Sequence, residues 1–344
     1  MRDRETRDER IDGAVTPAGI PESVEGEGSH PESSRSLLVK IAHLYYIENL
    51  SQKEIAQRTR ISVASVSRAL ARARDLKIVT ISIQGGENDY SGLEIEIERT
   101  FGLSECLLVP SYGRIEHTYQ GMAAAAADLL SRTLKPGATL GVSWGDTLRS
   151  VGESLPRMPS VRADVIPIIG ALGWIETGIY PNSIARTFAQ KMGGSSYLVN
   201  TPAFVDDPET RAALMADSNF RPVRDIWSRL DMAVLGVSGL TADSSMFRSG
   251  IFSEADLAGM REAGGECISN FVVFDGRGSM VPTGVSDRMV YLPLEDLRRV
   301  RTVAIAAAGA AKAEPLRAML RSGICSALVT DADCARALLS LQSA

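Results

Sequence analysis

Two groups of residues in this chain have the types and spacing to bind anions, and the first lies between Leu50 and Arg74. Hydroxyl and basic side chains recur there every three or four residues, the spacing that places side chains on one face of a helix. Small residues near a helix N-terminus allow close approach to a DNA groove, and lysine or arginine can contact phosphates and guanine edges. The candidate DNA-contacting residues are Lys53, Ser62, Ser65, Ser67, Arg68, Arg72 and Arg74. The alternative is an ordinary surface helical hairpin with a solvated basic face.

The second group lies in three loops that follow hydrophobic runs. Ser143–Thr147 opens a predicted helix, so its amides and the threonine hydroxyl could cradle a phosphate, although an ordinary turn with an N-cap has the same sequence. Gly236–Gly239 follows a buried run and fits a plain tight turn equally well. In Gly309–Lys312 the lysine would lie in the first turn of a helix, where it opposes the helix dipole. An anionic ligand would offset that placement, but a solvated lysine is the commoner case.

Two short helices joined by a tight turn would position the first group. Ser51 caps the first helix and forms a capping box with Glu54, and Ser62 caps the second helix. The candidate contact residues of the second helix are expected to face outward. Its inward apolar stripe is predicted to be Val63, Val66 and Leu70. A preceding apolar helix at 37–50 and an alternating strand at 78–83 complete a helix-turn-helix domain of the winged type.

From about residue 92 onward, predicted strands alternate with predicted helices. This alternation is typical of an α/β fold with a doubly wound, mostly parallel sheet. In such sheets ligands bind outside the carboxyl ends of the strands, where the strand order reverses, so the site is expected in the strand-to-helix loops. The predicted strands are Cys106–Pro110, Thr139–Trp144, Val165–Ile169, Tyr197–Asn200, Met232–Val237, Ile268–Phe274, Met289–Leu292, Val303–Ala307 and Ala327–Thr330. The predicted helices include Gly92–Phe101, Tyr119–Thr133, Thr147–Leu155 and Ser183–Met192.

Length and composition fit a globular chain of about two or three domains. The chain has 344 residues, of which 44% are apolar. No apolar run reaches the roughly 18 residues of a membrane span, and no signal-peptide core opens the sequence, so a cytoplasmic protein is expected, without a membrane partner. The four cysteines are scattered without CxxC spacing, which predicts neither a zinc site nor a disulfide framework. No metal and no cofactor are expected.

Charge is distributed unevenly along the chain. Residues 1–33 hold four Arg and nine Asp or Glu, and they are expected to form a disordered leader. Residues 34–84, the predicted helix-turn-helix domain, hold nine Lys or Arg and three Asp or Glu, although the whole chain has a net charge of −5. A basic segment on an acidic chain is what binding to a phosphate backbone requires. After a linker at 85–91, residues 92–344 are expected to form a ligand-binding and oligomerisation domain.

Several strings occur in an order that resembles the SorC-type sugar-binding transcriptional regulators, which are often grouped with deoxyribonucleoside-type regulators. The resemblance covers about Leu37 to Leu339. It rests on Leu50–Ala56, Ser65–Arg68, Ala71–Arg74, Ile78-Val79, Gly141–Thr147, Asn182 with Ile184-Ala185 and Phe188-Ala189, Pro202–Phe204, Gly265–Ile268, Phe274-Asp275, Gly309–Lys312 and Leu328–Asp331. It implies a DNA-binding domain joined to an effector domain with a fold like that of sugar-phosphate isomerases and deaminases. It also implies assembly into tetramers or dimers.

The same resemblance implies a set of effector-binding residues. Gly145, Asp146 and Thr147 would form an effector loop, Glu266 would bind sugar hydroxyls, and Lys312 would meet a phosphate. Arg248 is a candidate for a second anionic group, and Asn182 and Ser238 are candidates by position alone. The loop departs from some relatives in carrying Trp144 and Asp146. An aspartate beside a phosphate is unfavourable, so Asp146 would bind hydroxyls instead, or the effector would be an unphosphorylated polyol.

Three functions are compatible with the sequence. The leading hypothesis is a DNA-binding regulator, more often a repressor than an activator, of a carbohydrate or polyol operon. It would bind double-stranded operator DNA and be controlled by a sugar, polyol or sugar-phosphate effector, without catalytic residues. The second is a sugar-phosphate isomerase or deaminase with an accessory DNA-binding module, although only one histidine, His117, lies in the larger half. The third makes the larger half an oligomerisation scaffold only.

Overall fold

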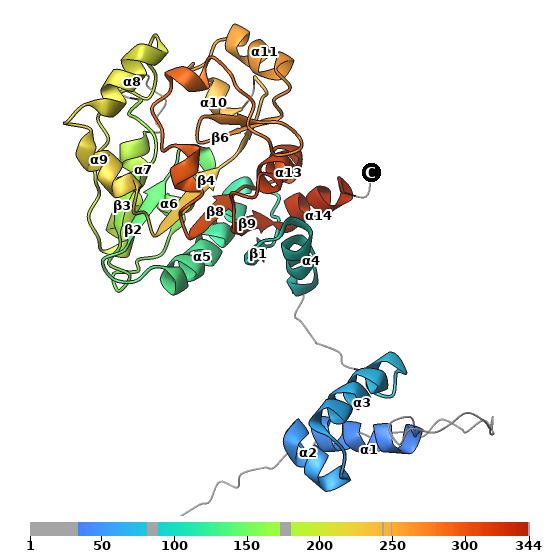
Figure 1. Cartoon of the computed structure of the whole chain (residues 1–344). Coiled ribbons are helices and arrows are strands. Elements are labelled where there is room, and N and C mark those ends of the chain that lie inside the picture. The colour runs from blue at the N-terminus through green and yellow to red at the C-terminus, as the bar shows by residue number, and fades with distance from the viewer. Residues whose placement is uncertain (1–33, 81–88, 173–179, 243, 249, 343–344) are drawn as a thin grey trace, which may run out of the picture. The chain divides into compact units, whose positions relative to one another are not determined.

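The computed structural model describes residues 34–80, 89–172, 180–242, 244–248 and 250–342 (Figure 1). They belong to two compact units, Met1–Gln84 and Gly85–Ala344. The predicted leader at 1–33 and residues 85–88 of the predicted linker lie outside the described residues.

The first unit contains α1 (Arg35–Tyr46), α2 (Gln52–Thr59) and α3 (Val63–Asp75). The predicted capping box is confirmed, because the Glu54 amide donates to Ser51 Oγ at 3.3 Å and the Ser51 amide donates to Glu54 Oε2 at 2.8 Å. The hydrogen bonds from Ser51 lower the pKa of the Glu54 carboxyl. Arg60 ends α2 in the left-handed conformation, at φ 57°, and Ser62 caps α3 by accepting from the Ser65 amide. The two helices are therefore joined by a short turn, as predicted.

The three helices bury one apolar cluster between them. Its buried residues are Leu38, Ile41, Ala42, Leu44, Ile55, Ala56, Val66, Ala69, Leu70 and Ala73. The prediction that Val63 belongs to this stripe is wrong: it is 46% exposed, because it lies at the first position of α3, at the edge of the stripe. Ile78 and Val79 form bends and pack on the cluster rather than starting a strand. Residues 81–83 of the predicted strand lie outside the described residues.

The second unit is built on a six-stranded sheet in which every neighbouring pair is parallel. The strands are β1 (Glu105–Val109), β2 (Thr139–Val142), β3 (Asp164–Pro167), β4 (Met232–Gly236), β8 (Thr302–Ala306) and β9 (Ala327–Asp331). A separate antiparallel sheet contains β5 (Ser238–Gly239), β6 (Cys267–Ser269) and β7 (Val272–Phe274). The helices are α4 (Ser91–Phe101), α5 (Ile115–Thr133), α6 (Asp146–Ser154), α7 (Pro181–Met192), α8 (Pro208–Ala216), α9 (Arg221–Trp227), α10 (Ser245–Arg248), α11 (Glu254–Glu262), α12 (Leu294–Leu297), α13 (Ala313–Arg321) and α14 (Ala332–Ser340).

The predicted α/β class with a parallel sheet is confirmed, and three predicted strands are corrected. Neither segment Tyr197–Asn200 nor segment Met289–Leu292 forms a strand. Isolated bridges occur in or beside them, such as Val165 with Ser196 and Ile169 with Tyr291. Ile268–Phe274 is not one strand, because the chain reverses within it and pairs β6 with β7. The difference arises because one apolar run can form either one strand or both arms of a tight hairpin.

The order of strands across the sheet is β1-β9-β8-β4-β2-β3. From β2 the chain steps outward to β3 and then returns to the other side of β2 as β4. The strand order therefore reverses between β2 and β4, which is where doubly wound sheets open a crevice for ligands. Both strands end at this crevice, because parallel strands have their carboxyl ends on one edge.

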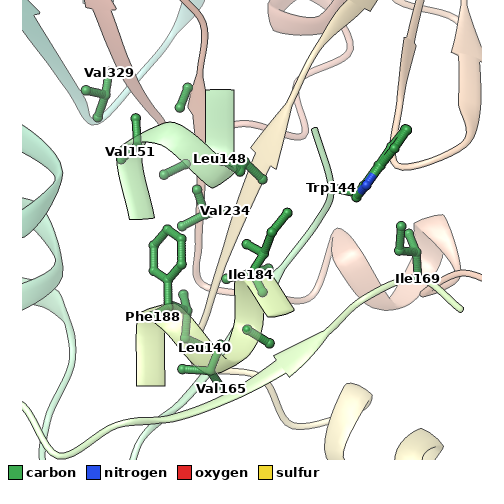
Figure 2. Close-up of a cluster of buried hydrophobic side chains, with 14 of the residues drawn as sticks. Leu140, Trp144, Leu148, Val151, Val165, Ile169, Ile184, Phe188, Val234 and Val329 are labelled. Carbon is green, nitrogen blue, oxygen red and sulfur yellow. The ribbon is translucent and has the colours of Figure 1, made fainter. Parts of the chain in front are cut away.

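Helices cover both faces of the sheet, and alternate residues of each central strand face opposite sides. In β4, Met232 and Val234 belong to one apolar cluster, whereas Ala233 and Leu235 belong to the other. Helices α5, α6 and α7 supply the first cluster, and α4, α9, α13 and α14 supply the second. Figure 2 shows the first cluster, with Phe188 of α7 near Leu140 of β2. Alternation on a doubly covered strand thus fixes the face of the sheet on which each side chain packs.

Gly141→Ala should destabilise the second unit by about 1–3 kcal/mol, as overpacking of a core does. A Cβ at this position of β2 would lie 2.6 Å from Ile168 Cγ2 and 2.7 Å from Leu230 Cδ1. The measurement is urea unfolding followed by tryptophan fluorescence, since all three tryptophans of the chain lie after residue 92. The matched control is Gly259→Ala in α11, whose Cβ would meet no atom within 4 Å. The control should be neutral or stabilising by up to about 1 kcal/mol; equal unfolding midpoints for the two variants would contradict this packing.

Candidate functional site

The carboxyl ends of β2 and β4 enclose a pocket, called here the inner pocket. Most of its lining comes from the β2–α6 loop, the β4–β5 loop, the turn between β6 and β7, and the segment before α13. The residues are Ser143–Leu148, Ile169, Gly236, Val237, Ser238, Met246, Ile268, Asn270, Phe271 and Lys312. All three loops singled out from the sequence contribute to it. The strand-order reversal therefore brings together segments that are far apart in the chain.

The N-terminus of α6 faces the inner pocket. Gly145 is the N-cap residue, with φ 134° and no side chain that could cap the helix. The first intrahelical bond is donated by the Arg149 amide to the Gly145 carbonyl at 3.0 Å. The amides of Asp146, Thr147 and Leu148 therefore point out of the helix end, and an anion bound there would meet the positive end of the helix dipole.

Lys312 reaches the same pocket from the other side. It ends a 3₁₀ turn, Ala310–Lys312, that leads directly into α13. Its Nζ donates to the Val237 carbonyl of the β4–β5 loop at 3.1 Å. This contact holds the ammonium group beside the crevice, where it adds a full positive charge to the partial charge of the α6 terminus.

Asp146, at the first position of α6, lies between two guanidinium groups. Its carboxylate is 3.6 Å from Arg149 on the same helix and 3.4 Å from Arg248 at the end of α10. The expected conflict between this aspartate and a phosphate is thereby reduced, because its charge is balanced by two cations. The sequence could not reveal this pairing, since Arg248 lies 102 residues away.

A wider cleft, called here the outer cleft, lies beside the inner pocket and shares Asp146, Thr147 and Lys312 with it. Its volume is about 730 Å³, against about 30 Å³ for the inner pocket. Its charged lining residues are Asp146, Arg248, Arg261, Glu266, Lys312, Glu314 and Arg317. Glu266 is 3.6 Å from Arg317, so this carboxylate is also paired. A ligand of sugar size fits the outer cleft and could insert one end into the inner pocket.

The turn between β6 and β7 is a part of the pocket that the sequence did not reveal. Asn270 and Phe271 both have positive φ, 47° and 64°, in the left-handed region that disfavours a phenylalanine. Asn270 Oδ1 accepts from Ser143 Oγ at 3.1 Å, which joins this turn to the β2–α6 loop. A two-residue turn usually carries glycine, so its absence hid the hairpin from sequence reasoning.

Comparison with known proteins matches residues 88–340 to the model of a putative sugar-binding domain, and residues 44–76 to sigma-70 region 4. A sorbitol operon regulator from Klebsiella pneumoniae is 32% identical over 308 residues, which cover 88% of this chain and 97% of that protein. This chain belongs to the SorC family of sugar-binding transcriptional regulators. The full-length crystal structure of SorC from Klebsiella pneumoniae aligns with a TM-score of 0.70 and 29% identity, over 88% of this chain and 98% of that one. An erythritol catabolism regulatory protein from Brucella abortus is 25% identical over 90% of this chain and 98% of its own length.

Most residues that the SorC-family resemblance implied for effector binding come together in the structure. Gly145, Asp146, Thr147, Ser238 and Lys312 line the inner pocket, and Arg248 and Glu266 line the outer cleft. Asn182 lies apart from both: its side-chain amide donates to the Val199 carbonyl and accepts from the Val199 amide, at 3.1 and 3.0 Å. Its hydrogen bonds therefore fix the chain after α7.

On α3 of this SorC-family chain, Ser67, Arg68, Arg72 and Arg74 are exposed, as is Lys53 on α2. Ser62 is exposed and serves as the N-cap. The expectation that Ser65 faces outward is wrong. It is 6% exposed, and its hydroxyl contacts Ser62 Oγ at 2.9 Å and accepts from Arg68 Nη2 at 3.1 Å. Ser65 thus connects the cap of α3 to the side chain of Arg68.

The remaining predictions concern thiols, metals and membranes. All four cysteines are buried and unpaired, and burial raises the pKa of each thiol, to about 12 for Cys325 and Cys334. Such thiols stay protonated at neutral pH and are unreactive. Across the described ranges, no three His, Cys, Asp or Glu side chains gather as metal ligands. Nor does any described helix combine the length and apolar character needed to cross a bilayer.

Ser238→Ala should leave the stability of the free protein unchanged or raise it. Ser238 is 5% exposed, and its Oγ has no hydrogen-bond partner among the described residues. A buried hydroxyl without a partner loses about 1–3 kcal/mol of hydration, which alanine does not. The comparison variant is Ser143→Ala, which should be destabilising because it removes the donor to the buried Asn270 side chain. Urea unfolding measures both, and a Ser238 variant less stable than the Ser143 variant would contradict this account.

Proposed function

We propose that this SorC-family regulator binds double-stranded operator DNA through α3 and is controlled by a sugar, polyol or sugar-phosphate effector. The effector would bind in the inner pocket and outer cleft. The observation that carries this proposal is the meeting of the α6 N-terminus with Lys312 where β2 and β4 end. Among its relatives, one is named for a sorbitol operon and another for erythritol catabolism.

The polar groups of the site are of two kinds: some suit an anionic group of a ligand, and others suit its hydroxyl groups. The α6 amides and Lys312 suit a phosphate or another anionic end. Glu266 and Ser238 suit hydroxyls, because a carboxylate accepts and a serine hydroxyl can both donate and accept. Asp146, already paired with Arg149 and Arg248, tolerates an anion nearby. A ligand with an anionic end and several hydroxyls therefore satisfies the lining best.

The first unit, which contains α1, α2 and α3, would bind DNA phosphates through its exposed basic side chains and contact base edges through α3. Binding should weaken steeply with salt, because each neutralised phosphate releases counterions. Control by the effector requires a coupling free energy between the two sites, and by linkage DNA and effector then change each other's affinity equally. We propose that the protein acts as a repressor in the cytoplasm and assembles as a dimer or tetramer, so that paired heads contact paired half-sites.

No specific observation favours the enzymatic alternative. His117, the acid–base candidate of the larger unit, packs its ring on Tyr112 at 6.2 Å between centroids. It is not among the described residues that line the inner pocket or the outer cleft. We therefore propose that the pocket binds its ligand without turnover.

Arg68→Ala should weaken operator binding by about 1–3 kcal/mol and relax the preference for one base pair, if Arg68 contacts a guanine edge. The duplex for this test is selected from a random pool by the unmodified protein, and affinity is measured by fluorescence anisotropy. Lys40→Ala is the control, because Lys40 is exposed on α1 rather than on α3. It should cost affinity equally for selected and scrambled duplexes. An Arg68 variant that keeps the selected base preference would refute this role.

Lys312→Ala should abolish the stabilisation of the protein by sugar phosphates. The panel contains fructose 6-phosphate, sorbitol 6-phosphate, ribose 5-phosphate, sorbitol and erythritol, each tested by thermal shift on the full-length protein. A ligand that binds only the folded state stabilises it by RT ln(1 + [L]/Kd). The variant loses the ammonium group at the mouth of the pocket, so a charged ligand should lose most of its affinity.

The matched control for this test is Lys135→Ala. Lys135 is exposed and precedes β2, at the opposite edge of the sheet from the pocket. It should respond to the panel as the unmodified protein does. A normal response of the Lys312 variant would remove Lys312 from the site, and silence of the unmodified protein across the panel would favour the scaffold hypothesis. Release of a new product during incubation would instead support an enzyme.

A further inference from the structure

One buried carboxylate of the second unit, that of Asp331, is not among the described residues that line the inner pocket or the outer cleft. Asp331 ends β9 and is 2% exposed. Its Oδ1 accepts from the Gly309 amide at 2.6 Å, and its Oδ2 accepts from the Ser111 hydroxyl in a short hydrogen bond. Buried carboxylates are retained only where donors replace their lost hydration, so these two contacts are what keep Asp331 in place.

Both donors belong to loops at the carboxyl edge of the sheet. Gly309 follows β8, and Ser111 follows β1. Ser111 is itself held, because its Oγ also accepts from the Asp333 amide in the first turn of α14 at 2.8 Å. Asp331 therefore ties the loops that follow β1, β8 and β9 to one another.

The Gly309 contact acts on the segment that carries Lys312. Gly309 has φ 88° and ψ 144°, a conformation open essentially to glycine alone, and it is the N-cap of the 3₁₀ turn that ends at Lys312. The Lys312 amide donates back to the Gly309 carbonyl at 2.9 Å. A shift of Gly309 would therefore move Lys312, which lies one turn away.

The charges of Asp331 and Lys312 also act on a common neighbour. Burial is the largest cause of the raised pKa of the Cys334 thiol in α14. The Asp331 carboxylate raises this pKa further, and the Lys312 ammonium group lowers it. The Ala310–Lys312 turn itself contacts α14, which begins directly after Asp331, although Asp331 is not among the described residues that line the inner pocket or the outer cleft.

We infer that Asp331 is a positioning residue of the effector site: it fixes the Gly309–Lys312 turn so that the Lys312 ammonium group stays at the mouth of the inner pocket. Asp331 acts through Lys312 and does not touch the ligand. The inference rests on the proposed function, because it assigns Lys312 to the anionic end of the effector. It gives the buried carboxylate a selective role, since only ligands that use Lys312 depend on it.

The test is Asp331→Asn in the full-length protein, with affinities for the five ligands of the panel and for inorganic phosphate measured by thermal shift and calorimetry. Asparagine has the size of aspartate but carries no charge, so the charge-assisted contacts to the Gly309 amide and the Ser111 hydroxyl are both weakened, even where the amide keeps a hydrogen bond to each. We expect affinity for phosphorylated ligands to fall at least tenfold, while affinity for sorbitol or erythritol changes less than threefold. A merely structural role would weaken both classes alike.

A double-mutant cycle adds a second readout. If Asp331 acts through Lys312, Asp331→Asn should have no further effect on phosphate affinity in a Lys312→Ala protein. Asp333→Asn is the matched control, because Asp333 is a neighbouring aspartate whose exposed side chain pairs with Arg336. It should bind every ligand as the unmodified protein does.

The outcomes separate the inference from the proposed function. If the unmodified protein binds no member of the panel, the proposed function fails. If it binds phosphorylated ligands and Asp331→Asn binds them equally well, or loses both ligand classes alike, the inference is overturned. Should Asp331→Asn fail to fold, Asp331→Ser decides, because the shorter side chain keeps a hydroxyl in the buried position but cannot bridge the Gly309 amide and the Ser111 hydroxyl as the carboxylate does. A selective loss of phosphorylated ligands in that variant supports the inference, and unchanged binding overturns it.

Discussion

In a parallel sheet that is covered on both faces, main-chain amide and carbonyl groups can bind a ligand only beyond the ends of the strands. In this molecule the strand order reverses between β2 and β4. At the reversal the β2–α6 connection and the β4–β5 connection diverge. The gap between them exposes the α6 amides to one space, and the remaining lining is arranged around that space.

Much of this arrangement follows from the sequence, because the strands that matter most are short apolar runs followed directly by glycine-containing loops. Thr139–Val142, Met232–Gly236 and Thr302–Ala306 were predictable on that basis. The hairpin at Asn270 was not, because its turn places non-glycine residues at positive φ and leaves no break in the apolar run. Such a turn is held by tertiary contacts, here with Ser143, which no local pattern encodes.

The errors about Val63 and Ser65 in the first unit have a different cause. Both concern which side of α3 faces the core. The spacing of apolar residues predicts that a helix forms better than it predicts which residues lie at the centre of its buried stripe. The observed stripe is centred on Val66 and Ala69, which leaves Val63 outside and turns Ser65 inward. A serine tolerates this burial because Ser62 and Arg68 satisfy its hydroxyl. Both partners lie three residues from Ser65, in the N-cap and the first turns of α3, so they satisfy its hydroxyl only once this helix has formed.

The charged groups of the pocket already have partners in the free protein. The affinity for a ligand is therefore the difference between the contacts of the bound protein and those of the free protein. Asp146 is paired with Arg248, Glu266 with Arg317, and the ammonium group of Lys312 contacts a main-chain carbonyl. An anionic ligand must therefore compete with contacts that the free protein already makes, and its net gain is smaller than its new hydrogen bonds suggest. A ligand that binds only through hydroxyl groups displaces fewer of these contacts and also gains less binding free energy. Effector control consequently depends on whether the exchanged contacts change the arrangement of the loops, because a ligand that binds two states equally shifts neither.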